Sequence, residues 1–400
     1  MSTTKGTDFR LREIAVAAYG PSAVSAIGYG AVMPVLALQA RALGADVSAA
    51  AFVVALWPLG MLATSLPAGA LVARLGERTT LLLAGLVDAV AMVGAALATT
   101  VWQLGVCVAV SGAAWTAFLI ARQGYLIDAV PMHWRARAMS LLGGTFRIGV
   151  LVGPLIGALL ISIADIRAVF LLSGATSVAA GLLALVMPDL GAESRTAQRE
   201  AGHVSVRSVL AAHRQTLLTL GVAVIVIGAS RSIRASLLPL WADGIGISAS
   251  TTSLIFAVAA FIDVLFFFPG GWLMDRRGRA LVAVPVVLSV AVACFLLPLT
   301  ATAVGVAAVM VLIAVGNGLG SGIVMTLGAD TAPAQGRAQY LGGWRLCGDI
   351  GNTGGPLVVA AVAAVAPLAT ACFVIGALGL AGAAWVGYWT HRLDLRRRTA

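Results

Sequence analysis

Long apolar runs alternate with short polar connections along this chain, from Ile14 to Trp389. Each run reaches about 18 residues or more, the length that an α-helix needs to cross the hydrocarbon core of a bilayer. The runs do not show the alternation, about ten residues per strand, that a membrane β-barrel requires. We therefore expect an all-α membrane protein. Its twelve predicted helices lie near residues 14–38, 48–73, 79–99, 102–127, 137–162, 167–187, 215–241, 249–273, 280–299, 302–328, 338–364 and 367–390.

Composition and charge support this interpretation. The chain is 60% hydrophobic and only 10% charged, whereas a soluble domain has about 25% charged residues. Of its 26 Lys and Arg residues, 19 fall in the two tails and in every second connection, and the opposite connections hold only Arg41 and Arg167. This bias predicts that both termini are cytoplasmic. The net charge of +10 therefore has a topological explanation, and we expect no nucleic acid partner.

One long polar connection divides the predicted helices six and six. We expect a six-helix bundle over residues 1–187, a cytoplasmic linker over 188–214, and a second bundle with a cytoplasmic tail over 215–400. A single offset of 202 residues aligns eleven Gly, Pro, Leu, Asp and Arg positions of the two halves, including Gly76 with Gly278 and Pro154 with Pro356. A duplicated six-helix unit is typical of transporters.

The segment "GGWLMDRRGR" follows the eighth predicted helix and contains Gly-x-x-x-Asp-Arg-x-Gly-Arg. This pattern resembles the signature loop of the major facilitator superfamily, and "AGALVARLGER" is its first-half counterpart, with Ala73 in place of the Asp. The segments "DAVPMHWRARA" and "DTAPAQGRA" also resemble that family's Asp-x-x-Pro-x-x-x-Arg turn. The resemblance covers essentially the whole chain. It implies two pseudo-symmetric bundles that rock against each other to expose a central site alternately to the two sides.

The resemblance further implies a breakable cytoplasmic latch at these loops. Ion pairs of a few kcal/mol can bias two states without locking either. The alternative is that the arginines simply follow the positive-inside rule. Because Ala73 lacks a carboxylate, we expect a latch that relies more on the second half. The candidate latch residues are Gly69, Arg74, Gly76, Asp128, Arg135, Gly271, Asp275, Arg276, Gly278, Arg279, Asp330 and Arg337.

The fifth predicted helix carries a Gly-x-x-x-Gly-Pro-x-x-Gly segment formed by Gly149, Gly153, Pro154 and Gly157. It resembles, in part, the antiporter motif of exporters in this superfamily. Small residues on one face let helices approach closely, and the proline permits a bend. The alternative is ordinary packing, since the eleventh helix has the same Gly-x-x-x-Gly-Pro core. Gly157, which only the fifth helix has, favours export.

Eight charged residues fall inside predicted spans, where each needs a partner, water or a function. Arg147 and Asp263 lie at a similar depth, about 15 Å at 1.5 Å per residue, on helices that are neighbours in this fold. We therefore expect an Arg147–Asp263 pair whose protonation couples to rocking. Arg345 and Asp349 share one helix face and form either a self-neutralising pair or a second coupling site. For Asp88 we expect a structural contact.

Helices 1, 4, 7 and 10 line the cavity in this fold, so residues on one face of each are candidates for substrate binding. Each stripe by itself is also compatible with packing. The intramembrane arginines outnumber the aspartates, which suits an anionic or zwitterionic substrate. The candidates are Tyr19, Met33, Trp115, Phe118, Arg122, Arg231, Arg234, Asn317 and Ser321.

No Walker-type loop, metal-ligand cluster or intramembrane nucleophile–base constellation is present in the sequence. We therefore expect neither an ATP-driven pump nor an enzyme, and no metal or other cofactor. The expected function is proton-coupled export of a small organic molecule by a monomer in a bacterial plasma membrane. Proton-coupled uptake of an organic anion is the alternative, and a non-transporting sensor is a remote one.

Overall fold

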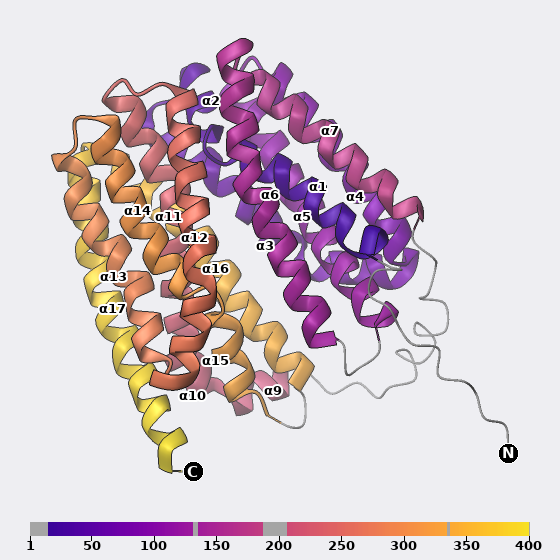
Figure 1. The fold of residues 1–400 in the computed structure, drawn as a ribbon, viewed down its shortest axis with the longest axis vertical. Coiled ribbons are helices and arrows are strands. Elements are labelled where there is room, and N and C mark those ends of the chain that lie inside the picture. The colour runs from indigo at the N-terminus through magenta and orange to yellow at the C-terminus, as the bar shows by residue number, and fades with distance from the viewer. Residues whose placement is uncertain (1–14, 131–134, 187–205, 334–336, 400) are drawn as a thin grey trace, which may run out of the picture.

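The structure is a computed structural model that describes residues 15–130, 135–186, 206–333 and 337–399. It is helical throughout these ranges (Figure 1). The α-helices are α1 (Ala15–Val32), α2 (Leu36–Ala42), α3 (Val47–Leu75), α4 (Glu77–Leu97), α5 (Val101–Ala129), α6 (Arg135–Ile163), α7 (Arg167–Leu183), α9 (Val206–Ala212), α10 (Arg214–Thr216), α11 (Val222–Gly244), α12 (Ala249–Arg277), α13 (Ala280–Leu296), α14 (Ala303–Leu319), α15 (Ile323–Thr331), α16 (Arg337–Ala363) and α17 (Leu368–Thr399).

The expected membrane spans are present. Within the described residues, eleven helical segments are long and apolar enough to cross a bilayer, and α1 with α2, bent by 43°, makes up to twelve. The chain is therefore a multi-pass membrane protein of the expected fold class. Part of the expected linker, residues 206–212, forms α9, which packs on α16. Most of the remaining linker lies outside the described residues.

Helix ends repeat at the offset found in the sequence. The Thr100 side chain accepts a hydrogen bond from Gln103 N at the start of α5, and Thr302 does the same for Gly305 N at the start of α14. Such N-caps satisfy backbone donors that have no partner inside the helix. Gly76 (φ 82°, ψ 166°) and Gly278 (φ 106°, ψ 170°) both hold a conformation open essentially only to glycine.

Helices α1 to α7 pack mainly with one another, as do α10 to α17 (Figure 1). We call these sets the N-terminal half and the C-terminal half. The most extensive contacts between the halves are those of α3 with α16 and of α6 with α12, and α11 also contacts α2 and α3. Glycine residues let helices approach closely in both halves. A Cβ on Gly153 would meet the Ile27 carbonyl of α1, and one on Gly351 would meet the Ile225 carbonyl of α11.

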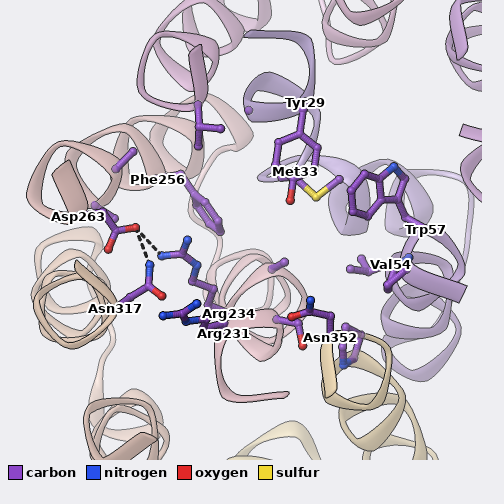
Figure 2. A pocket seen from close by; sticks show the side chains of 18 of the residues that line it. Tyr29, Met33, Val54, Trp57, Arg231, Arg234, Phe256, Asp263, Asn317 and Asn352 are labelled. Atoms are coloured by element: carbon purple, nitrogen blue, oxygen red, sulfur yellow. Dashed lines mark hydrogen bonds and ion pairs between the residues drawn. The ribbon is translucent and has the colours of Figure 1, made fainter. Parts of the chain in front are cut away.

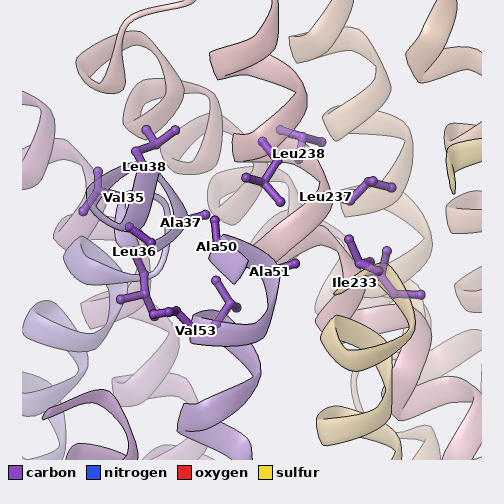
Figure 3. Close-up of a cluster of buried hydrophobic side chains, with 14 of the residues drawn as sticks. Val35, Leu36, Ala37, Leu38, Ala50, Ala51, Val53, Ile233, Leu237 and Leu238 are labelled. Atoms are coloured by element: carbon purple, nitrogen blue, oxygen red, sulfur yellow. The ribbon is translucent and has the colours of Figure 1, made fainter. Parts of the chain in front are cut away.

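The halves also meet around α2, at the upper end of Figure 1. A cluster of buried side chains there combines Val35 and Leu36 with Leu237 and Leu238 of α11 (Figure 3). Where such apolar side chains are removed from water, their burial stabilises the contact between the packed elements. Polar contacts add to it: Arg41 Nε lies 3.1 Å from Asp243 Oδ2, and these two residues are 202 positions apart.

Candidate functional site

A cavity of about 460 Å³ lies between the two halves. Residues of α1, α3 and α6 line one side, and residues of α11, α12, α14 and α16 line the other. Figure 2 shows Tyr29, Met33 and Trp57 facing Arg231, Arg234 and Asp263 across this space. Ligand cavities in proteins typically measure about 300–1,000 Å³ and combine an apolar wall with a few polar groups. The size and lining therefore suit a small organic molecule.

Asp263 is the centre of a polar network on the C-terminal side of the cavity. Its Oδ2 accepts hydrogen bonds from Arg234 Nη1 at 3.1 Å and from Asn317 Nδ2 at 3.0 Å. Its Oδ1 is buried and has no hydrogen-bond partner among the described residues. A buried carboxylate needs compensation, and here it comes from a guanidinium and an amide on neighbouring helices of the same half.

This arrangement corrects the expected Arg147–Asp263 pair. The Arg147 guanidinium carbon lies 4.5 Å from the centroid of the Phe267 ring on α12 and forms no ion pair within the described part of the chain. Phe267 follows Asp263 by one helical turn, so the Arg147 side chain contacts α12 about one turn away from the expected carboxylate. Helix α6 does face α12 across the two halves, as expected, but Arg234 of α11 lies closer to the carboxylate.

The other two intramembrane carboxylates have different partners. Arg345 Nε lies 3.9 Å from Asp349 Oδ2, and Arg345 Nη1 also lies 3.5 Å from Gln123 Oε1 of the other half. Asp88 accepts hydrogen bonds from the hydroxyl groups of Ser111 and Ser177 at 2.5 Å each. Asp88 thus ties α4 to α5 and α7, away from the main cavity, which is a structural contact of the kind expected.

Arg231 has no carboxylate at ion-pair distance among the described residues, although the charge of Asp263 acts on it from further away. Its Nη2 donates to the Gly320 carbonyl at 2.5 Å, and its Nε is buried without a hydrogen-bond partner. Among the residues that the structure describes, no carboxylate pairs with it, nor with Arg122 or Arg147. Arg122 instead donates to Ser22 Oγ at 3.1 Å and lies against the rings of Phe118 and Phe146. The interior between the halves therefore carries excess positive charge.

Aromatic rings form the N-terminal side of the cavity. The Tyr29 ring centroid lies 5.0 Å from that of Trp57, 5.3 Å from that of Trp115 and 5.8 Å from that of Phe146. These separations are in the range of favourable aromatic contacts. Tyr29, Trp57 and Phe146 line the cavity, whereas Trp115 supports them from behind.

The predicted substrate-binding residues divide into two groups. Met33, Arg231, Arg234 and Asn317 line the cavity. Tyr19, Trp115, Phe118, Arg122 and Ser321 do not: Tyr19 and Phe118 belong to a separate buried cluster, and Ser321 donates to the Asn317 carbonyl. A residue can therefore lie on a helix that lines the cavity while its side chain points away from the cavity.

Sequence reasoning missed other lining residues, namely Tyr29, Trp57, Phe146, Phe256 and Asn352. A signal for one of them was present: Tyr29 precedes Arg231 by the 202-residue offset.

The predicted latch residues lie at the end of the molecule away from α2. Arg74, Asp275 and Arg276 are exposed. Arg279 Nε pairs with Asp330 Oδ2 at 2.9 Å, within the C-terminal half. The side chains of Asp128, Arg135 and Arg337 lie outside the described set. The latch role stays a prediction.

The expected close packing of the helix-5 segment is visible in the structure. Gly149 and Gly153 abut α1, where an added Cβ would meet Ala26 and the Ile27 carbonyl. A Cβ on Gly157 would lie 3.6 Å from Ala31, which is an ordinary contact. Gly351 and Gly355 make equivalent approaches in α16. The close packing is therefore a property of both halves.

Comparison with known proteins shows which family has this architecture. The sequence profile of the Major Facilitator Superfamily matches residues 22–356. The chain belongs to this superfamily. It is 26% identical over 108 residues to the uncharacterized MFS-type transporter YhjO of Bacillus subtilis (strain 168), a match that covers 27% of each chain.

Solved structures of transporters share the fold of this superfamily member. A POT family transporter in complex with a thioalcohol-conjugated peptide superimposes with a TM-score of 0.78 at 12% identity, covering 96% of both chains. A D-xylose–proton symporter gives 0.72 at 18% identity, covering 94% of this chain and 97% of that one. The nucleoside transporter NupG gives 0.71 at 15% identity, covering 93% and 98%.

Proposed function

We propose that this superfamily member carries a small organic anion across the membrane together with protons. The observation that supports this proposal is Arg231, a guanidinium at the cavity with no carboxylate partner among the described residues. The lining ion pair Arg234–Asp263 is neutral, and Asp349 faces Arg345. An anionic group on the ligand would compensate the remaining charge, which is costly when left unpaired at membrane depth.

Asp263 is the carboxylate that we assign to proton coupling. Protonation of Asp263 would weaken its hold on Arg234, and the released guanidinium would then be available to the bound anion. Proton binding and anion binding would each favour the other, as thermodynamic linkage requires. A proton gradient directed into the cell would therefore drive uptake. Asp349, with Arg345 beside it on α16, is a second candidate position for the proton, and Arg147 is assigned to the same coupling through its place on α6 opposite α12.

The two halves would rock around this cavity, as alternating access requires. With both termini in the cytoplasm of a bacterial cell, the contacts around α2 would close the outer side. The described arrangement would then be the one that releases substrate and protons into the cell. The exposed charges of the signature loops would then form the opposing latch when the cavity turns outward.

Proton-driven export is the second candidate, and the Gly149–Gly157 segment favours it through its resemblance to the antiporter motif of exporters. The charge of the substrate separates the two candidates. Antiport requires that substrate and proton exclude each other. A cationic substrate would meet this condition if it bound to Asp263 or Asp349 only when that carboxylate is ionised.

The sign of proton movement tests the proposal in proteoliposomes that contain a pH-sensitive dye. We would add benzenesulfonate, phenylalanine and benzyltrimethylammonium from outside in turn. Benzenesulfonate should acidify the lumen, because anion and proton enter together. Acidification should be lost in Asp263→Asn, because the amide takes up no proton. Exchange of labelled for unlabelled benzenesulfonate should persist, because the neutral amide resembles the protonated carboxyl group and leaves Arg234 available to the anion.

Asp88→Asn is the matched control, since it alters a buried carboxylate that lies outside the cavity. It should leave the acidification intact. Alkalinisation on addition of benzyltrimethylammonium, without any response to benzenesulfonate, would replace the proposal with export by antiport. No proton movement with any of the three compounds would overturn both.

A further inference from the structure

Three aromatic side chains of the N-terminal half line the cavity and form one apolar surface. Tyr29, Trp57 and Phe146 come from α1, α3 and α6, so the chain folds three separate helices to bring them together. Their mutual contacts, together with Trp115 behind them, restrict the side chains before any ligand binds. Such preorganised rings lose little entropy when a further ring packs on them.

Polar groups face this surface from the other half. Figure 2 shows Arg231 and Arg234 across the cavity from Trp57, and it shows the Tyr29 hydroxyl group directed into the space between them. Arg231 lines this wall, and within the described part of the chain no carboxylate lies at ion-pair distance from its guanidinium. One wall of the cavity thus offers ring faces, and the opposite wall offers a guanidinium.

We propose that the cavity binds an aromatic acid, with its ring against Tyr29 and Trp57 and its acid group on Arg231. The inference rests on the proposed anion transport and names the class of anion. A volume of about 460 Å³ has room for a compound of one or two rings. An aliphatic acid would satisfy Arg231 but would lack the edge and face interactions that aromatic rings make with one another.

Three probes of similar size separate the contribution of the aromatic ring from that of the negative charge. Benzenesulfonate has both the ring and the acid group, cyclohexanesulfonate keeps the acid group and the six-membered skeleton, and benzenesulfonamide keeps the ring without the charge. We would measure half-saturation of labelled benzenesulfonate exchange in proteoliposomes, with each of the other two as competitor. Benzenesulfonate should bind about fivefold more tightly than cyclohexanesulfonate, and benzenesulfonamide should bind least well.

Replacement of the aromatic surface should remove the preference for a ring. In the double variant Tyr29→Leu, Trp57→Leu, the half-saturation for benzenesulfonate should rise about tenfold, with a change of less than about twofold for cyclohexanesulfonate. Phe268→Leu is the matched control, because Phe268 is 78% exposed on the surface of α12. It should leave the binding of all three probes unchanged.

Replacement of the guanidinium should act on charge instead. Arg231→Gln should weaken both sulfonates by about thirtyfold and leave benzenesulfonamide unchanged, and Arg231→Lys should recover part of the loss. Thermal unfolding and size-exclusion profiles of each variant would show whether it folds. If the Gln variant does not fold, Arg231→Lys still tests the proposal.

The outcomes distinguish this inference from the proposed function. Equal binding of benzenesulfonate and cyclohexanesulfonate, with proton coupling intact, would overturn the aromatic assignment and leave anion transport standing. An equal loss for both sulfonates in the Leu double variant would do the same, because it would show that the rings only hold the fold. If neither sulfonate bound to the folded wild-type protein, both the aromatic assignment and anion transport would be overturned.

Discussion

From the N-terminal half the cavity receives Tyr29, Trp57 and Phe146, and from the C-terminal half it receives Arg231, Arg234 and Asp263. One pair from these two sets, Tyr29 and Arg231, occupies equivalent positions in the duplicated unit. Counting 202 residues onward, Tyr29 corresponds to Arg231, Trp57 to Ala259 and Trp115 to Asn317. An aromatic side chain in the first copy is thus replaced by a polar or small one in the second.

Positions that shape the backbone behave differently. Thr100 and Thr302 cap equivalent helices, Gly76 and Gly278 end equivalent helices with positive φ, and Gly149 and Gly351 admit a neighbouring helix in each half. The comparison teaches that the two copies keep the residues that bend and space helices, and differ where side chains face the cavity. Few residue types fit the backbone at a helix end or a close approach of helices. A side chain that faces the cavity does not pack against a neighbour on that side, so more residue types are allowed there.

The largest expected effect tests how closely helices approach in the C-terminal half. A Cβ on Gly270 of α12 would meet the Leu319 carbonyl of α14, whereas the equivalent position in the N-terminal half, Ala68, already holds one. Gly270→Ala should therefore destabilise the protein by about 3 kcal/mol, measured as a lower thermal unfolding temperature in detergent. Gly271→Ala is the control, since its Cβ would meet nothing within 4 Å. Equal losses in both variants would contradict the helix spacing described here.

A smaller effect should distinguish the two signature loops. Gly76→Ala forces alanine into a glycine conformation, at a cost of about 1 kcal/mol. Gly278→Ala should cost about 2 kcal/mol, because its Cβ would also displace Asp394. That carboxylate accepts hydrogen bonds from Arg279 N at 2.9 Å and Ala280 N at 3.0 Å.

Asp394→Ala should reduce the difference between the two glycine variants when all are compared by thermal unfolding. If Gly76→Ala proved the more damaging of the two, the contact with α17 would not contribute to the stability of the second loop.

The smallest effect concerns Arg41 and Asp243, which join equivalent positions of the two halves at the α2 end. Their side chains are 36% and 38% exposed, and such pairs contribute about 0–1 kcal/mol. Arg41→Asp should lower, by a few-fold, the ratio of molecules whose halves are in contact at the α2 end to molecules whose halves are apart there. The exchange Arg41→Asp, Asp243→Arg should restore it. Accessibility of a cysteine placed at Ser48 to a membrane-impermeant thiol reagent would measure the shift, and an unchanged rate in all variants would show that the pair has no part in closure.

The sequence predicted the membrane spans and the family well, because both depend on local quantities. Hydropathy over about 20 residues identifies a span whatever surrounds it, and the signature loops are short patterns. The site was predicted only in part. Arg231, Arg234, Asn317 and Met33 line the cavity, but Asp263 pairs with Arg234 rather than Arg147. A pairing across helices depends on the rotation and slide of each helix, which depth counted along the chain does not contain.

The sequence by itself determined where the helices run, that the chain is a repeated unit, and that more arginine than aspartate enters the membrane. Only the tertiary structure decided which arginine at the cavity has no carboxylate at ion-pair distance among the described residues, and which rings lie opposite it. The physical reason is that hydrophobic periodicity and backbone capping are satisfied within one segment, whereas a charge is neutralised and a cavity is walled by side chains from several helices, whose mutual positions follow from packing of the whole.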